Sequence, residues 1–370
     1  MQSSKKLLWE CDSGTRAKLE VLQRYLGAWF NILASSGIEN VLYVDGFCGP
    51  GEYVGGEKGS PVVAAELANS ASRKFPNFNV HLVCIDVREE VLDHLQALPA
   101  IRHRHSRVNL DVRKGEFAAE IVRVLHNGGY HTQWPIFSFV DPFGFSGISQ
   151  STFQLLMRNR SSEVFVNLWC GFMNRFIDHP DDDVRQCIAN LLGKESLPRI
   201  VRATDRISEI CSIFQDNLQQ LGPFVRRFMM RDENNTRDNA LFFCGRNERG
   251  LEKVKEAMWK VDPVFGASFS EHGSLKSEET LPGLQQAQTA SLRRMLLNAF
   301  SGRPATSVAS LIRWTIVETE TYLPRHLRQE LEYLNSHGRL TYIDPAPTGR
   351  KRQAGHWPER LQLTFMGPNG

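Results

Sequence analysis

The sequence predicts an α/β protein built on a doubly wound, mostly parallel sheet. Across residues 15–261, short apolar runs typical of buried strands alternate with amphipathic segments of helix length. Several of the expected strands end in glycine or an acidic residue, at the sheet edge where parallel sheets bind ligands. Strands that alternate with helices in this way favour a Rossmann-like architecture.

The expected elements follow one another regularly through the first half of the chain. Residues 15–37 have leucine and aromatic side chains at helical spacing, and Ser60 as N-cap followed by Pro61 predicts the start of a second helix. The remaining expected elements are strands at 41–45, 80–86, 105–112 and 136–140, and helices at 91–98 and 116–129. Two late strands, around RRFMMRDE and NALFFCG, precede a final helix.

A change in composition predicts a second domain. We expect residues 1–270 to form the α/β domain, with a helical insertion at 172–222, and the polar stretch 271–283 to be a linker. Residues 284–370 contain three short amphipathic helices and then two strand candidates with a basic segment between them, the order of a winged helix-turn-helix domain. Its third helix enters a groove and its basic loop touches phosphates. The expected nucleic-acid contacts are Arg325, Arg328, Arg350, Lys351 and Arg352.

Charge and composition restrict the class of partner. The formal net charge is +3, and residues 291–370 carry eleven Lys/Arg against six Asp/Glu, which favours a nucleic-acid partner for this segment. No apolar run approaches the roughly 20 residues that a bilayer requires, and the N-terminus lacks a secretory signal, so we expect a cytoplasmic protein with no membrane partner. The seven cysteines form no C-x-x-C pair, which disfavours disulfides and zinc, and no metal is expected.

A glycine loop after the first strand indicates a nucleotide-type ligand. In VDGFCGPGEY, Asp45 ends the strand, and the loop carries Gly46, Phe47, Gly49 and Gly51, with glycine where a Cβ would collide with a ligand. The loop lacks the lysine and Ser/Thr of a phosphate loop, and its GxxGxG pattern differs from the dinucleotide GxGxxG.

Two further acidic residues are expected at neighbouring strand ends. Asp86 follows the second strand, where a carboxylate can accept both hydroxyls of a ribose. Asp111 is expected at the end of the third strand, where it could accept from an adenine amino group. Acidic residues at three strand ends around a glycine loop favour S-adenosylmethionine as the cofactor, because this molecule has no phosphate to neutralise.

The stretch FSFVDPFGFSG at 137–147 resembles the fourth motif of amino-directed methyltransferases, and its DPFG is similar to that of tRNA guanosine N2-dimethyltransferases. Chemically, the Asp141 carboxylate can accept a hydrogen bond from an exocyclic amine, and Phe143 can stack on the base. Pro142 fixes the turn and could aim its carbonyl at the same amine. No Pro-Cys pair follows the fourth strand, which disfavours cytosine C5 methylation by a thiolate.

Together, TRAKLEVLQRYLGAWFNIL, YVDGFCGPGEYVGGEKGSP, FVDPFGFSG and LFFCGRNERGLEKVKEAMW resemble the three-Cys-motif partner protein family over roughly residues 9–265. The resemblance implies a class I methyltransferase-like fold and a radical-SAM-like three-cysteine protein as a partner. It also places Lys18 in the catalytic site, although Leu19 stands where relatives more often have histidine.

These observations predict a methyltransferase that acts on an exocyclic amine of a nucleic-acid base, of the guanine N2 or adenine N6 type, with DNA favoured over RNA. Its catalytic residues would be Lys18, Asp141, Pro142 and Phe143. The alternatives are a non-catalytic DNA-binding or partner protein that retains the fold as a scaffold, and a nuclease or DNA-repair component.

Overall fold

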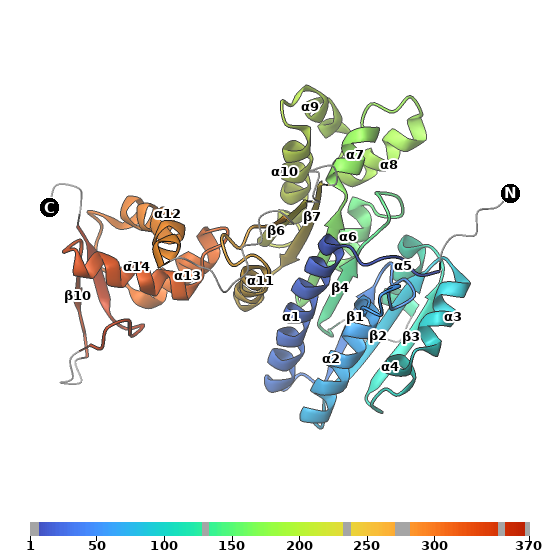
Figure 1. The fold of residues 1–370 in the computed structure, drawn as a ribbon, viewed down its shortest axis with the longest axis horizontal. Helices are drawn as coiled ribbons and strands as arrows, with labels where there is room; N and C mark the ends of the chain where they lie inside the picture. The colour runs from blue at the N-terminus through green and yellow to red at the C-terminus, as the bar shows by residue number, and fades with distance from the viewer. Residues whose placement is uncertain (1–6, 128–132, 232–237, 271–281, 347–351, 367–370) are drawn as a thin grey trace. The chain divides into compact units, whose positions relative to one another are not determined.

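The computed structural model describes residues 7–127, 133–231, 238–270, 282–346 and 352–366 (Figure 1). The chain divides into two compact units. The first comprises Met1–Val261 and Ser268–Gly273, and the second comprises Asp262–Ala267 and Ser274–Gly370. No helix in the described ranges combines the length and apolarity needed to cross a bilayer.

The first unit is built around one eight-stranded sheet with the strand order β3-β2-β1-β4-β5-β7-β6-β8. The strands are β1 (Asn40–Asp45), β2 (Asn79–Asp86), β3 (Val108–Lys114), β4 (Ile136–Val140), β5 (Ser162–Leu168), β6 (Phe224–Arg231), β7 (Asp238–Gly245) and β8 (Ser268–Ser270). Strands β1 to β5 pair in parallel, whereas β7 is antiparallel to both β5 and β6. The expected Rossmann-like, mostly parallel sheet is therefore confirmed.

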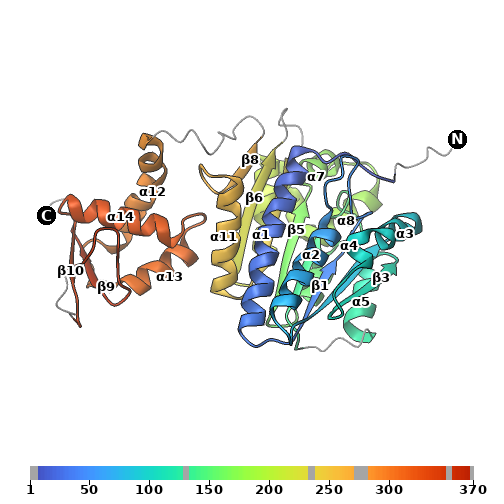
Figure 2. The same ribbon diagram turned by 60° about the horizontal axis from the view of Figure 1, so that its bottom comes forward.

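Helices cover both faces of this sheet, which explains why β4 and β5 are buried along their whole length. One face is covered by α1 (Ser13–Ser35), α2 (Ser60–Lys74) and α11 (Glu248–Val261), where α1 packs between the other two (Figure 2). Against the opposite face pack α5 (Phe117–Asn127), α6 (Gln150–Leu156) and α10 (Arg206–Gln219). Two short helices, α3 (Glu89–Ala97) and α4 (Pro99–Arg102), connect β2 to β3.

The start of α2 differs from the prediction. Gly59, rather than Ser60, is the N-cap, and Ser60 is the first helical residue. A Cβ at Gly59 would lie 2.9 Å from the carbonyl carbon of Gly51, so glycine is needed where the two ends of the loop meet. The Ser60 side chain is consequently buried next to Asp45.

Residues 170–219 form mainly helices between β5 and β6. They are α7 (Cys170–Phe176), α8 (Asp182–Leu192), a short 3-10 turn (Lys194–Ser196), α9 (Leu197–Arg202) and α10. Apolar residues of α8 and α10, including Ile188 and Phe214, join the core beneath β5 and β7. This helical segment is thus continuous with the core of the first unit.

The second unit contains three helices and a small antiparallel sheet. Its elements are α12 (Pro282–Phe300), β9 (Thr306–Ser307), α13 (Val308–Glu318), α14 (Pro324–Ser336), β10 (Leu340–Ile343) and β11 (Gln362–Phe365). The sheet order is β10-β11-β9, and a core that includes Leu296, Leu327 and Trp357 joins the helices to the sheet. The three expected helices and the two expected strands occur in the order that the sequence predicts.

Candidate functional site

The direction of the chain connections reverses between β1 and β4, and open α/β sheets bind ligands at such a point. Asp45 is the last residue of β1 and pairs in register with Phe139 of β4, two residues before Asp141. Asp86 ends the neighbouring strand β2. The strand order therefore brings the carboxylates of Asp45, Asp86 and Asp141 to one edge of the sheet.

Two glycines of the loop after β1, Gly46 and Gly51, lie against the protein's own side chains. A Cβ on Gly46 would lie 2.7 Å from the Phe117 ring, and one on Gly51 would lie 2.6 Å from a methyl group of Leu95. Gly51 also has a positive φ of 86°. At these two positions glycine lets α5 and α3 pack against the loop, and the room that it leaves for a ligand stays a prediction.

Asp45 is completely buried beneath this loop. The Tyr43 hydroxyl donates a hydrogen bond to its Oδ2 at 3.0 Å, whereas its Oδ1 has no hydrogen-bond partner among the described residues. Burial raises the pKa of Asp45 to about 7, although the nearby Ser60 and Tyr43 hydroxyls act in the opposite direction. A buried acceptor that lacks a donor is a natural position for an ammonium group or a water molecule.

Next to the loop is a cavity of about 520 Å³, which we call cavity A. Its lining includes Trp9, Phe47, Asp86, Phe117 and Phe143. Asp86 accepts a hydrogen bond from the backbone N–H of Arg88 at 2.9 Å, which fixes its carboxylate at the cavity wall. Cavity A therefore combines aromatic surfaces with an oriented carboxylate.

The position predicted for Asp111 is wrong. Strand β3 continues to Lys114, and Asp111 pairs in register with Val83, three residues before the end of β2. Its carboxylate accepts hydrogen bonds from the Arg113 side chain, at 2.7 and 2.9 Å. Asp111 is not in the lining of cavity A, so we no longer assign it to the cofactor.

A second cavity of about 240 Å³, cavity B, lies beside the first. Lys18 of α1 is only 6% exposed, and its ammonium group pairs with Oδ2 of Asp141. The side-chain amide of Asn167 donates to the other oxygen, Oδ1, at 2.7 Å. Tyr53 and Trp169 also line cavity B, and burial raises the pKa of the Tyr53 hydroxyl, which keeps it protonated.

Trp9, Phe47 and Phe143 form a wall common to both cavities. Phe143 is 64% exposed, an unusual position for a phenylalanine, and its ring centroid lies 5.1 Å from that of Trp9. The Arg88 guanidinium lies 4.7 Å from the Trp9 ring. These rings therefore give cavities A and B an aromatic surface where the two cavities meet.

Pro142 follows Asp141 at the end of β4, as the sequence indicated, but its carbonyl has a local partner. The Gly144 N–H donates to this oxygen at 3.1 Å. Gly144 has a positive φ of 103°, which allows the turn that presents Phe143. The carbonyl of Pro142 therefore stabilises the turn.

Sequence reasoning missed Trp9, Tyr53, Asn167 and Trp169. The sequence could have indicated Asn167, because it is a polar residue within the otherwise apolar stretch VFVNLW and therefore needs a partner in the core. Trp9 had none, since it lies in an irregular segment whose place over the glycine loop depends on the hydrogen bond from the Val54 N–H to its carbonyl.

In the second unit, the proposed nucleic-acid contacts have different environments. Arg325 is exposed and Arg328 is half-buried on α14, whereas Arg350 and Lys351 lie outside the described residues. The Arg352 side chain is 9% exposed, pairs with Glu332 at 2.9 Å and stacks on Trp357. Arg352 therefore stabilises the second unit, and we no longer assign it to phosphate contact.

The described part of the chain contains no group of three or more His, Cys, Asp or Glu side chains that could hold a metal ion. The cysteines at positions 11, 48, 84, 170, 187, 211 and 244 are all free thiols.

Comparison with known proteins gives similarity at the level of the fold. No protein-family model matches the chain, and no curated protein matches it. The chain is similar to an O-methyltransferase from Bacillus cereus in complex with SAH (14% identity, 64% of this chain and 82% of that chain, TM-score 0.35). It is also similar to human methyltransferase-like protein 13 in complex with SAH (14%, 66% and 91%, 0.34) and to protein LPL1258 from Legionella pneumophila (10%, 68% and 94%, 0.38).

Because these identities and scores are low, the class of fold rests on the sheet itself. The order β3-β2-β1-β4-β5-β7-β6, with β7 alone antiparallel to its neighbours, is that of class I SAM-dependent methyltransferases. The first unit has this methyltransferase-like fold.

Proposed function

We propose that the protein is a SAM-dependent methyltransferase that acts on an exocyclic amine of a nucleic-acid base. The observation that carries this proposal is the position of Asp141. It follows β4 beside the glycine loop, its carboxylate is oriented by Lys18 and Asn167, and the exposed Phe143 stands two residues later.

The residues around cavity A fit S-adenosylmethionine. Asp45 lies beneath the loop, outside the lining of cavity A, and its partnerless Oδ1 would reach the ammonium group of the methionine part through a water molecule. Asp86 suits the ribose hydroxyls, and the rings of Phe47 and Phe117 offer an apolar surface to the adenine. When bound, the cofactor supplies an electrophilic methyl group on a positively charged sulfur.

Cavity B would hold the target amine of the substrate, next to the cofactor in cavity A. Asp141 would accept one N–H of the target amine, which directs the nitrogen lone pair away from the carboxylate and toward cavity A. Phe143 would stack on the base, with Trp9 behind it. Lys18 balances the charge of Asp141 in a site with little access to water.

The second unit supports a nucleic-acid substrate. Its three helices followed by a strand hairpin match a winged helix, in which α14 would read a groove with Arg325 and Arg328. We favour DNA over RNA, and a base in a duplex would have to be flipped out to reach cavity B. The predicted radical-SAM-like three-cysteine partner remains part of this proposal on the sequence resemblance alone.

The proposal is tested by calorimetric titration with S-adenosylmethionine, together with a labelled-methyl assay over DNA and RNA. We expect Asp86→Ala to abolish cofactor binding, and Asp141→Asn to abolish methyl transfer while cofactor binding remains. Asp93→Asn, an exposed position on α3, is the matched control. Unchanged transfer by Asp141→Asn would refute the assigned mechanism.

A second candidate is a non-catalytic DNA-binding or partner protein. It is favoured by the observation that each oxygen of Asp141 already accepts a donor from the protein, Lys18 on one side and Asn167 on the other. In that case S-adenosylmethionine would bind, DNA affinity would be unaffected by Asp141→Asn, and no nucleic acid would be methylated by the wild type.

A further inference from the structure

Some cations of the first unit have no ion-pair partner, and they lie close together. Residues 7–126 contain thirteen Lys and Arg side chains, and eight of them pair with a carboxylate: Arg16, Lys18, Arg24, Lys58, Arg88, Arg113, Lys114 and Arg123. The other five form no ion pair with a described residue: Arg73, Lys74, Arg102, Arg104 and Arg107. Unpaired cations in this part of the chain are thus confined to two short segments, 73–74 and 102–107.

These two segments pack against each other. The first is the end of α2, and the second runs from the last residue of α4 to the residue before β3. The backbone N–H of His105 donates to the side chain of Asn69 at 2.8 Å, and the Arg107 guanidinium donates to the carbonyl of Ser72 at 2.6 Å. The five unpaired cations therefore share one region of the first unit, which we call the basic surface.

Acidic side chains are absent from both segments and from their neighbours in the sequence. Neither 67–81 nor 97–110 contains Asp or Glu. The exposed Glu39 lies at the border, where its carbonyl accepts from the N–H of Asn79 at 2.7 Å, but its carboxylate forms no ion pair with a described residue. The five Lys and Arg side chains thus carry a charge of +5 that no paired carboxylate neutralises.

The hydrogen bonds of these cations go to neutral groups. Arg104 and Arg107 are half-buried and donate to backbone carbonyls, which leaves their charge uncompensated. Partial burial lowers the pKa of Arg104, so an anion near its guanidinium would be stabilising. Arg73, Lys74 and Arg102 are exposed, and an anion in solution can reach them.

The basic surface lies at the edge of the sheet opposite to cavities A and B. Arg107 directly precedes β3, and its carbonyl accepts from the N–H of Val80 near the start of β2. Asp45 and Asp86, in contrast, are the last residues of β1 and β2. At about 3.3 Å per residue, strands of six to eight residues separate the two edges by about 20 Å.

The two edges differ in the sign of their charge. The linings of cavities A and B contain two cations, Lys18 and Arg88, against six acidic residues: Glu10, Asp12, Glu52, Asp86, Glu116 and Asp141. A polyanion that approaches the first unit is therefore attracted to the basic surface and repelled at the edge that holds the proposed methyl-transfer site.

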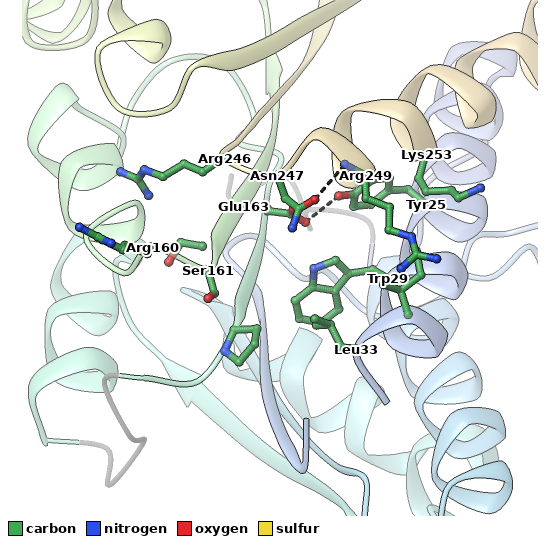
Figure 3. A pocket seen from close by; sticks show the side chains of 14 residues that line it. Tyr25, Trp29, Leu33, Arg160, Ser161, Glu163, Arg246, Asn247, Arg249 and Lys253 are labelled. Carbon is green, nitrogen blue, oxygen red and sulfur yellow. Dashed lines mark hydrogen bonds between the residues drawn. The ribbon is translucent and has the colours of Figure 1, made fainter. Parts of the chain in front are cut away.

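Four further cations near the starts of the strands do not belong to the basic surface. Arg160, Arg246, Arg249 and Lys253 surround a cavity of about 180 Å³ above the buried Glu163. Their head groups lie on two sides of Glu163, and those of Arg160 and Arg246 point away from it (Figure 3). These side chains therefore do not face a common partner.

The composition of the basic surface favours a nucleic-acid backbone over a membrane. Four of its five cations are arginines, whose planar guanidinium matches the geometry of a phosphate group. Neither 67–81 nor 97–110 has an exposed large apolar side chain, so this surface has nothing to insert into a bilayer. A nucleic acid, in contrast, presents a row of phosphates to which separate cations can each bind.

We propose that the basic surface binds the phosphate backbone of a nucleic acid. This contact goes beyond the proposed methyl transfer, because it lies at the opposite edge of the sheet and needs neither the cofactor nor the target base. It belongs to the first unit and is therefore also distinct from the contacts proposed for α14. It would hold a stretch of nucleic acid other than the one that carries the target base.

The test is fluorescence anisotropy of the full chain with a labelled DNA duplex of about 20 base pairs and with RNA of the same length, between about 50 and about 200 mM salt. The main variant is Arg73→Ala/Arg102→Ala, since both side chains are exposed and neither donates a hydrogen bond to a described residue. We expect the slope of log affinity against log salt for DNA to fall by about 2, because two phosphate contacts are lost. At about 0.1 M salt the affinity should fall at least about tenfold.

The matched control is Arg24→Ala/Arg123→Ala. It removes the same charge from two exposed arginines, each of which already pairs with a glutamate on its own helix. Its salt slope should equal that of the wild type. Asp141→Asn should also bind nucleic acid like the wild type, so a failure of the proposed methyl transfer would not affect this result.

Two results would overturn the proposal. One is an equal affinity and salt slope in the wild type and in Arg73→Ala/Arg102→Ala, which would assign all binding to the second unit. The other is no binding of DNA or RNA by the wild type. If phosphatidylserine vesicles were bound instead, and the same variant lost this binding, the partner of the basic surface would be a membrane.

Discussion

Replacing the buried acid Glu163 by glutamine should make the stability of the protein less dependent on pH. The folded protein raises the pKa of this group from 4.5 to about 7 because burial disfavours the charged form. The folded state therefore holds a proton that the unfolded chain has lost between these two values. The contribution of Glu163 to stability is fully present below pH 4.5 and is lost as the pH rises through 7.

The magnitude follows from the two pKa values. At about 1.4 kcal/mol for each pKa unit, the wild type should lose about 2.5 kcal/mol relative to Glu163→Gln between pH 5 and pH 8. Glutamine keeps the shape of the side chain and can still accept from Tyr25, so the comparison isolates the ionisation.

The assay is urea denaturation at pH 5, 6, 7 and 8, with hydrogen exchange of the β5 amides to confirm that the transition is that of the first unit. Glu90→Gln, an exposed position on α3, is the control and should follow the wild-type pH dependence. If the free energies of unfolding of the wild type and Glu163→Gln run parallel across this range, the argument from burial is refuted.

Three further outcomes are expected. Gly51→Ala should destabilise the first unit by about 3 kcal/mol, because the new methyl group would collide with its neighbours and the backbone has a positive φ. Gly56 also has a positive φ but open space around it, so Gly56→Ala should destabilise the unit by only about 1 kcal/mol. Urea denaturation compares the two variants. Arg293→Ala removes the ion-pair partner of Glu330, which is 2% exposed. It should lower the free energy of unfolding of the second unit by about 3 kcal/mol, which calorimetry would measure. Phe143→Ala should reduce methyl transfer at least about tenfold, a larger effect than its effect on cofactor affinity, because the ring belongs to the walls of both cavities; equal rates would remove this ring from the site.

The main elements of the first unit could be predicted because their sequence signals are local. Strands β4 and β5 are buried on both faces, so they appear as continuous apolar runs. The acidic residues that end β1 and β2 and that follow β4 mark the edge of the sheet where the site is proposed. The position of Asp111 was mispredicted because the sequence does not show that β3 continues for three more residues, so this residue lies before the end of the strand.

The features that escaped prediction depend on contacts between distant segments. Asn167 reaches Asp141 only because β5 lies beside β4, and Arg246 reaches the carbonyl of Asn159, just before β5, only because β7 runs in the opposite direction. Arg352 was expected at a basic surface, but Glu332 and Trp357 from other parts of the second unit engage its guanidinium. Composition alone cannot distinguish a buried, paired arginine such as Arg352 from an arginine that is free on the surface.

The aromatic wall shared by cavities A and B would make the binding of one proposed ligand affect the binding of the other. The linings of both cavities include Trp9, Phe47 and Phe143, so the position of each ring affects the shape of both cavities. A ligand that fixes these rings from one side removes conformational freedom that the second ligand would otherwise have to restrict. The two ligands would then bind with positive cooperativity and with little movement of the backbone, and steady-state kinetics would show each one lowering the apparent Michaelis constant of the other.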